Sequence, residues 1–207
     1  MISVLIPSYN NPDGLTDCVS SLLYNCHSIK NIEILVRLDK NDPQFKEYSG
    51  SLGTISMIHS DLGSGYEKLH LFVNELASHS TGDWLLLMTD DSIMKTKSWD
   101  VVINYYNDRD ICVLNPCGDG LNLFPIVKRK LYNILGHLAL QPHYDTYIQD
   151  LSGLLKCYIR LYNLDIEHTG KINDHSETSK HYYSKEIQDL LKQDAQKIED
   201  YLTKNGK

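Results

Sequence analysis

The stretch of sequence that decides the fold runs from Asp83 to Ser92 and reads DWLLLMTDDS. Its apolar run, Trp84 to Met88, has the length of a strand buried on both faces of a sheet, and Gly82 marks a turn before it. The run ends at two adjacent carboxylates, Asp90 and Asp91. Ligands of open α/β sheets bind at the carboxyl ends of the strands, so these acids form the first candidate site. A second interpretation stays open, in which Asp90 caps a helix and Asp91 is solvated.

Strands and helices alternate through the first half of the chain. Apolar residues predict strands over residues 2–6, where Pro7 ends the run, and over 32–38 and 54–59. Helical spacing predicts a helix after Asn11, a candidate N-cap followed by Pro12, and another from Leu69 to Leu76. This alternation predicts an α/β fold with a mainly parallel central sheet flanked by helices.

The second half has a less regular pattern. It predicts a helix over residues 94–107, a strand over 111–114, an extended segment over 123–127 and a helix over 128–135 that ends at Gly136. A loop over 137–146 leads to a helix that begins near Asp150, with Leu151, Leu154, Leu155 and Tyr158 on one face. Residues 184–202 predict an amphipathic helix.

Composition limits the class of protein. A chain of 207 residues is long enough for one substantial core, and we expect one domain over residues 1–207. The net charge of −7 and the lack of a long basic run argue against a nucleic-acid binder. Five cysteines without CxxC spacing, no secretory signal and no membrane-spanning apolar stretch predict a soluble, cytoplasmic protein with reduced thiols.

Four stretches of the chain carry a family resemblance. Residues 2–10, ISVLIPSYN, look like a first strand that ends in P-[ST]-[YF]-N. Asp39 follows the second strand, residues 74–84 read NELASHSTGDW, and Thr89 to Ser92 form a D-x-D-like position in which Ser92 replaces a third acid. In this order and spacing, the stretches resemble the family 2 glycosyltransferases of the GT-A fold.

The resemblance implies a Rossmann-like nucleotide-sugar-binding half over about residues 1–92. A small acceptor-binding half over about 93–183 and the C-terminal helix at 184–207 would follow. It implies a metal-dependent, inverting transfer of a sugar from a nucleotide-diphosphate sugar, with a UDP-sugar favoured, to a hydroxyl of a glycan or other acceptor. The small acceptor half also suggests further domains of a larger protein.

The resemblance also assigns roles to the donor-site residues. Asp91 would hold Mn²⁺ or Mg²⁺, which take oxygen ligands and keep several waters, and Asp90 would hold the ribose. Asp39 would contact the base, although a turn-forming role stays open for it. The segment that surrounds the nucleotide would comprise Pro7, Ser8, Tyr9 and Asn10.

Three further positions have alternatives. Lys68 would contact the base or a phosphate, or be a solvated lysine. His168 would reach the metal or diphosphate in preference to His175, or be a solvated loop histidine. Inversion needs a base that accepts the proton of the acceptor hydroxyl opposite the leaving group. Because residues 125–129, Gly136 and Asp150 resemble the family's acceptor region, Asp150 is the first candidate base; Asp145 is the alternative, with a loop cap as its other interpretation.

Two competing functions remain. A sugar-phosphate nucleotidyltransferase would have a Gly- and Arg-rich phosphate loop after the first strand, and residues 7–11, PSYNN, are not such a loop. A non-catalytic nucleotide-sugar-binding module would not need all four acids, so the presence of Asp39, Asp90, Asp91 and Asp150 argues against it.

Overall fold

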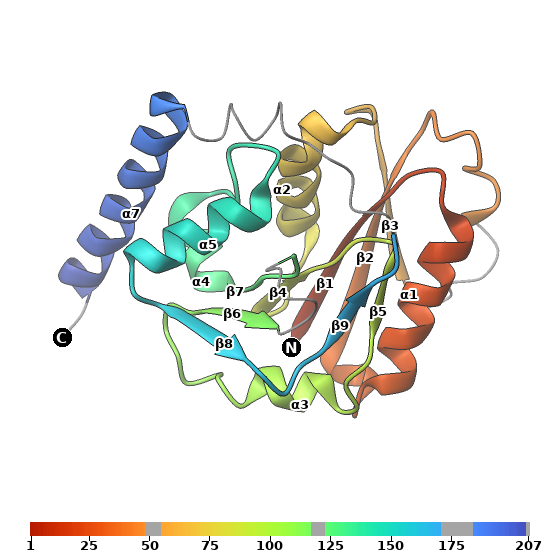
Figure 1. Ribbon diagram of the computed structural model, residues 1–207, viewed down its shortest axis with the longest axis horizontal. Coiled ribbons are helices and arrows are strands. Elements are labelled where there is room, and N and C mark those ends of the chain that lie inside the picture. Colours follow the sequence, from red (N-terminus) through yellow and green to blue (C-terminus); the bar gives the residue numbers. More distant parts are fainter. Residues whose placement is uncertain (49–54, 117–122, 171–183, 206–207) are drawn as a thin grey trace.

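The computed structural model describes residues 1–48, 55–116, 123–170 and 184–205. In this part of the chain a seven-stranded sheet has the order β3-β2-β1-β4-β7-β6-β8 (Figure 1). The strand bounds are β1 (Ile2–Ser8), β2 (Ile32–Asp39), β3 (Ile55–Ser60), β4 (Trp84–Leu87), β6 (Val113–Pro116), β7 (Ile126–Lys128) and β8 (Tyr158–Leu161). A separate two-stranded sheet pairs β5 (Ser92–Met94) with β9 (Ile166–His168).

The large sheet is mainly parallel, as predicted. Strands β3, β2, β1 and β4 run parallel, and β8 is parallel to β6. Among the described strands of this sheet, only β7 runs antiparallel to its neighbours, β4 and β6. β4 lies between β1 and β7, so the apolar run that begins at Trp84 forms the centre of the sheet.

Helices cover both faces of the sheet. The helix bounds are α1 (Pro12–Asn25), α2 (Leu69–His79), α3 (Trp99–Asn104), α4 (Arg129–Leu135), α5 (Tyr144–Leu154) and α7 (Lys185–Asn205), with short 3₁₀ turns η1 (Ile29–Asn31) and η3 (Tyr66–Lys68). Trp84 and Leu86 belong to a core that includes α1 and α3, whereas Leu85 and Leu87 belong to a core with α2, α4, α5 and α7. Strand side chains alternate between faces, so this fully buried strand joins the two cores.

The first loop forms almost as predicted. Asn11 caps α1, because its Oδ1 accepts a hydrogen bond of 3.2 Å from the Gly14 amide, and Pro12 starts the helix. The expectation that Pro7 ends the first strand is wrong, since β1 continues to Ser8 beside β2. Pro7 has no N–H to donate, and only the pairing of β1 with β4 ends early, at Leu5.

Two predicted helices have other bounds in the structure. The helix expected over residues 94–107 is confined to α3, and Ser92–Met94 form β5, which pairs antiparallel with β9. The helix expected to begin near Asp150 begins at Tyr144, and Tyr158 lies in β8 rather than on that helix. The acid in the first turn of α5 is therefore Asp145.

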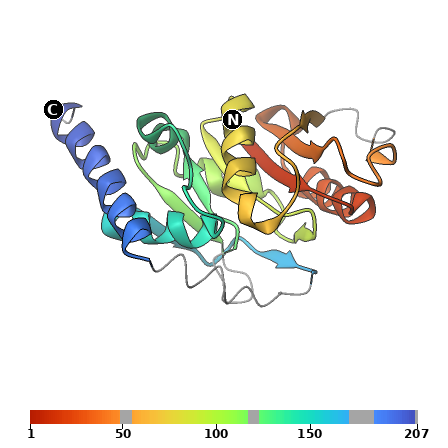
Figure 2. The ribbon, with the colours of Figure 1, turned by 90° about the horizontal axis from the view of Figure 1, so that it is seen from above.

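α7 packs against α5 and α4 at the edge of the molecule opposite α1 (Figures 1 and 2). Its apolar face is buried, as the pattern predicts, and includes Ile187, Leu191 and Ile198. Asp194 lies on the same buried face and accepts hydrogen bonds from His137 Nε2 at 2.7 Å and Tyr147 Oη at 2.6 Å. No helix in the described ranges is both long and apolar enough to cross a bilayer.

Candidate active site

A cleft of about 790 Å³ opens at the carboxyl ends of β1 and β4. Its wall is formed by Pro7 and Ser8 at the end of β1, by Tyr9 after it and by Thr89, Asp90 and Asp91 after β4, together with residues from η3, α2, the start of α5 and β9. This is the edge of the sheet at which the two adjacent acids were expected to bind a ligand. Segments far apart in the sequence therefore meet at one site.

Asp90 joins the loops that follow β1 and β4. Its Oδ2 accepts a hydrogen bond of 2.6 Å from Ser8 Oγ and one of 3.4 Å from the Tyr9 amide. Burial raises the pKa of Asp90, and the adjacent Asp91 raises it further, while hydrogen bonds from Ser8 and Asn11 lower it. Asp90 is thus held in a fixed position with a carboxylate that is costly to keep charged.

Asp91 lies next to His168, with 3.3 Å between Asp91 Oδ2 and His168 Nε2. The pairing of β5 with β9 places Ser92 opposite His168 and brings the two segments together. The backbone carbonyl of Asp91 also accepts hydrogen bonds of 2.8 Å from both the amide and the hydroxyl of Thr169. The predicted partner His168 is therefore beside the predicted metal ligand, and His175 lies outside the described residues.

The surroundings of Asp91 and His168 fit a divalent cation. Asp91 Oδ1 and His168 Nδ1 are buried and have no hydrogen-bond partner in the described part of the chain. A Cβ on Gly170 would overlap Asp91 Oδ2, so this glycine keeps space free at the carboxylate. Within the described ranges no third His, Cys, Asp or Glu completes a ligand cluster, so a cation here would take its other ligands from substrate and water.

Ser92 has a structural role in place of a third acid. Its side chain is fully buried, and its Oγ donates a hydrogen bond of 2.6 Å to the Thr89 carbonyl. This bond closes the turn that carries both acids. An aspartate at this position would bury another charge next to Asp90 and Asp91.

Asp39 is buried but does not line the cleft. Its Oδ1 accepts a hydrogen bond of 2.8 Å from the Asn41 amide, and its Oδ2 lies 3.7 Å from Arg37 Nη2. The residue of β2 that does line the cleft is Arg37. Asp39 therefore lies behind the cleft wall, next to Arg37, and its predicted contact with the base stays a prediction.

Arg37 was missed in the sequence. Its Nη2 donates a hydrogen bond of 2.9 Å to the Gly63 carbonyl, and its guanidinium lies 3.7 Å from the centre of the Phe72 ring. Glu75 Oε2 is 3.5 Å from its Nε. The signal that could have found it is a charged residue inside an otherwise apolar predicted strand, because a buried arginine needs carboxylate and carbonyl partners.

Tyr9 and Asn10 differ in what they face. Tyr9 lines the cleft, and its side chain is 46% exposed. Asn10 does not line it; this residue has a positive φ of 53°, and its amide donates a hydrogen bond of 2.7 Å to Asp42 Oδ2. The next amide, that of Asn11, donates to Tyr48 Oη at 2.7 Å. Asn10 therefore contributes the turn in the loop after β1, and the hydrogen bonds to Asp42 and Tyr48 hold the backbone of that loop in place.

Lys68 does not itself line the cleft, although Tyr66 and Leu69 on either side of it do. Its Nζ donates a hydrogen bond of 2.8 Å to the Leu62 carbonyl and so closes the loop before α2. That loop carries Tyr66, which does line the cleft. Lys68 thus stabilises the loop that forms part of the cleft wall.

Asp145 lines the cleft from the first turn of α5. Burial raises its pKa, although the Thr146 amide and His143 lower it. His143 is fixed by its neighbours, since its Nδ1 lies 3.1 Å from Tyr66 Oη and its amide donates a hydrogen bond of 2.8 Å to Gln141 Oε1. The cleft therefore contains a carboxylate with a raised pKa on the wall contributed by α5.

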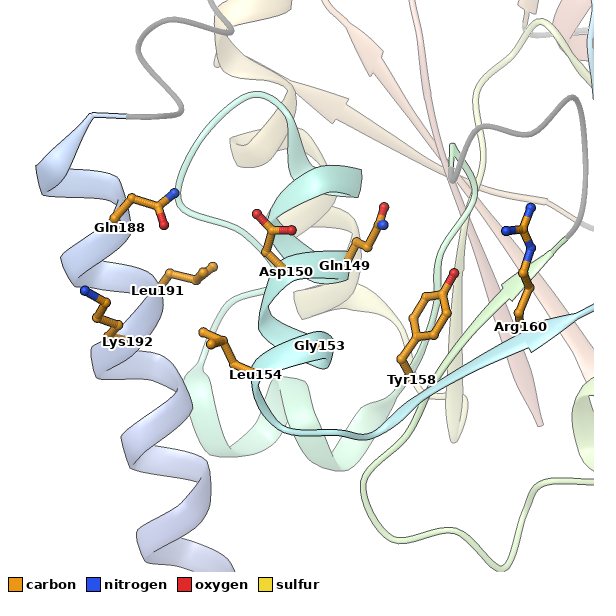
Figure 3. Close-up of a pocket in the computed structure, with 9 residues that line it drawn as sticks. All are labelled: Gln149, Asp150, Gly153, Leu154, Tyr158, Arg160, Gln188, Leu191 and Lys192. Carbon is orange, nitrogen blue, oxygen red and sulfur yellow. The ribbon is translucent and has the colours of Figure 1, made fainter.

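Asp150 lies in a different cavity, of about 570 Å³, between α5, β8 and α7 (Figure 3). Since α5 begins at Tyr144, Asp150 is in its middle. Five helical residues turn the side chain by about 140° relative to Asp145. The structure thus brings Ser8, Asp90, Asp91, Asp145 and His168 together and leaves Asp150 out.

The comparisons with known proteins agree with this architecture. The family model described as Glycosyl transferase family 2 matches residues 3–161, so the chain belongs to this family. No curated protein matches the chain.

Three solved structures have a similar fold. Mannosyltransferase PcManGT from Pyrobaculum calidifontis, in complex with GDP-Man and Mn²⁺, is 11% identical with a TM-score of 0.66, over 85% of this chain and 59% of that one. S. aureus TarS 1–349 in complex with UDP is 15% identical with a TM-score of 0.62, over 77% and 57%. Glucosyl-3-phosphoglycerate synthase from Mycobacterium tuberculosis, in complex with Mn²⁺, UDP and phosphoglyceric acid, is 12% identical with a TM-score of 0.64, over 86% and 73%. The chain spans less than two thirds of the first two proteins.

Proposed function

We propose that the protein transfers a sugar from a nucleoside-diphosphate sugar, with a uridine nucleotide favoured, to a saccharide hydroxyl with inversion and with a divalent cation bound. The observation that carries this proposal is the convergence of Asp90, Asp91, His168 and Asp145 on one cleft. Asp90 and Asp91 follow β4, Asp145 lies in the first turn of α5, and His168 lies in β9. The cleft therefore has separate groups for holding the donor and for activating the acceptor.

On the donor side, Asp91 and His168 would hold Mn²⁺ or Mg²⁺, and Asp90 would accept hydrogen bonds from the ribose. A bound cation would neutralise the negative charge that develops on the leaving diphosphate. Two of the similar structures contain UDP and one contains GDP-Man, which supports a uridine donor and makes a guanosine donor the competing choice.

On the acceptor side, Asp145 would take the proton of the attacking hydroxyl. A base is most effective when its pKa lies near the working pH, and burial raises the pKa of Asp145 toward that range. Attack from the α5 wall, opposite a diphosphate held at Asp91, would invert the anomeric centre. We therefore assign to Asp145 the role first expected of Asp150.

A screen of UDP- and GDP-sugars with and without Mn²⁺ tests this function. A donor that binds the folded state raises the melting temperature, and that rise should require both the nucleotide sugar and the cation. With the stabilising donor, an acceptor mixture should yield a glycoside of inverted configuration and free nucleoside diphosphate. Stabilisation without turnover would instead identify a binding module, and pyrophosphate release from a nucleoside triphosphate would identify a nucleotidyltransferase.

A further inference from the structure

The cavity that contains Asp150 is a second site on the molecule, separate from the cleft (Figure 3). We propose that it binds the part of a saccharide acceptor that extends away from the reacting hydroxyl. This inference rests on the proposed function, since it names the acceptor as a glycan longer than a single sugar. It concerns acceptor binding alone and assigns no catalytic step to the cavity.

The position of the cavity follows from the geometry of α5. Asp145 lines the cleft, and Gln149 and Gly153 line the second cavity. Residues spaced by four share one face of a helix, so these three lie in a row. At a rise of about 1.5 Å per residue, Gln149 is about 6 Å and Gly153 about 12 Å from Asp145 along the axis. A short glycan that leaves the cleft along this face would reach the cavity.

The groups around the cavity suit a ligand rich in hydroxyls. The side-chain amides of Gln149 and Gln188 both donate and accept hydrogen bonds, Asp150 accepts them, and Arg160 and Lys192 donate them. In Figure 3, Gln188 points from α7 toward α5, while Tyr158 and Arg160 stand on β8. Sugar hydroxyls are both donors and acceptors, so they can use all of these groups.

The cavity also has an apolar surface against which a sugar ring can lie. Tyr158 supplies an aromatic face, and its position is held by a hydrogen bond of 3.1 Å from Asn115 Nδ2 to its hydroxyl. Leu154 and Leu191 add aliphatic surface on either side of the gap between α5 and α7. Pockets that combine such surfaces with a few fixed polar groups are typical of small-ligand sites.

Gly153 forms an open part of the cavity wall. A Cβ at this position would meet no atom within 4 Å, so packing against other parts of the protein does not require glycine here. Glycine inside a helix costs about 1 kcal/mol relative to alanine. The missing side chain leaves this part of the wall open, and a side chain added here would start in open space.

The experiment compares the wild type with Gly153→Leu and with Gln193→Leu, which adds the same side chain to an exposed position of α7. Each protein is applied to a printed array of glycans that ranges from monosaccharides to long oligosaccharides, and the glycans bound are titrated in solution. We expect the wild type and Gln193→Leu to bind oligosaccharides more tightly than the matching monosaccharides. Gly153→Leu should lose roughly tenfold or more of the oligosaccharide affinity, with monosaccharide binding unchanged.

Three results would overturn the inference: no glycan bound by the wild type, equal binding by Gly153→Leu, or affinity that does not depend on glycan length. Donor use is measured separately, as the Mn²⁺-dependent thermal shift with UDP-sugars, and should be the same in all three proteins. If donor binding is present but Gly153→Leu binds glycans normally, the second site is wrong and the proposed function stands. If glycans bind through Gly153 but no nucleotide sugar is used, the proposed function is wrong.

Discussion

His168 Nε2 lies 3.3 Å from Asp91 Oδ2, although the two residues belong to segments that follow different strands of the large sheet. The small β5–β9 sheet brings the two residues together, because its register places His168 opposite Ser92, the residue after Asp91. A carboxylate and an imidazole at this spacing can share one cation. The geometry of a two-stranded sheet therefore decides whether the proposed metal ligands meet.

Replacement of Asp91 should abolish the response to metal. In Asp91→Asn we expect transfer to fall by roughly 100-fold or more, because the cation supplies several kcal/mol of charge stabilisation. His168→Asn should raise the Mn²⁺ concentration needed for half-maximal activity. The control is Glu167→Gln, since Glu167 points to the opposite face of β9 and is bonded to Lys95 at 2.7 Å. Full Mn²⁺-dependent transfer by Asp91→Asn would rule out the assignment.

Asp90→Asn should make the protein more stable and less active. The pKa of Asp90 is raised in the folded state, so its contribution to stability is present at low pH and is lost as the pH rises through that pKa. At neutral pH the variant should melt a few degrees higher than the wild type, and the difference should shrink in acid. The donor KM should rise because the ribose loses its acceptor. A lower melting temperature of Asp90→Asn at neutral pH would contradict the claim that the charged Asp90 carboxylate destabilises the folded protein.

The acidic limb of the pH–rate profile should report Asp145. Its raised pKa places the loss of activity above the usual aspartate value of about 3.9. Asp145→Asn should lower kcat by about 10²–10⁴-fold, and His143→Leu should move the acidic limb to higher pH because His143 lowers the pKa of Asp145. Asp150→Asn should leave the limb in place. If Asp150→Asn removes the limb and Asp145→Asn does not, the base is Asp150.

Asp194 should stabilise the attachment of α7. Burial raises its pKa, but the bonds from His137, Tyr147 and Lys197 outweigh this effect and lower the pKa overall. The stabilisation is therefore present above the unfolded-state pKa of about 3.9 and is lost as the pH falls through the folded-state pKa. Asp194→Asn should cost about 1–3 kcal/mol at neutral pH in urea denaturation, since buried bonds are weakened.

Asp200→Asn is the matched control for this measurement. Asp200 lies on the same helix but is exposed, and it accepts a hydrogen bond from Gln196. Its replacement should change the free energy of unfolding very little. Equal effects of the two substitutions would show that the buried hydrogen bonds of Asp194 do not stabilise the fold more than an exposed carboxylate does.

Local patterns were sufficient for much of the fold. The apolar run before Asp90 and Asp91, the cap at Asn11 and the final amphipathic helix each depend on neighbours in sequence, and the structure contains all three. Their position also identified the acids at the sheet edge. Short-range patterns were enough to predict these three features, to within a few residues at their ends.

The errors in the sequence reading have physical causes. His143, the residue before α5, makes no side-chain capping bond, so no local signal marks the start of the helix, and the acid in its first turn was taken to be Asp150. β5 and β9 have three residues each and are separated in the chain by α3, β6, β7, α4, α5 and β8, so no periodicity reveals their pairing. Arg37 lies on β2 and packs against Phe72 of α2, a contact between distant segments that the sequence does not show.

The β5–β9 pairing has a consequence for the order in which the protein assembles. The segment that carries His168 comes after all the strands of the large sheet in the chain. A nascent chain can therefore form the large sheet and position Asp91 before β9, which carries His168, pairs with β5. In the folded protein, detachment of this three-residue strand would release a cation held at the proposed site while the large sheet stays folded. The rate of cation exchange would then measure the opening of one short strand rather than the unfolding of the whole protein.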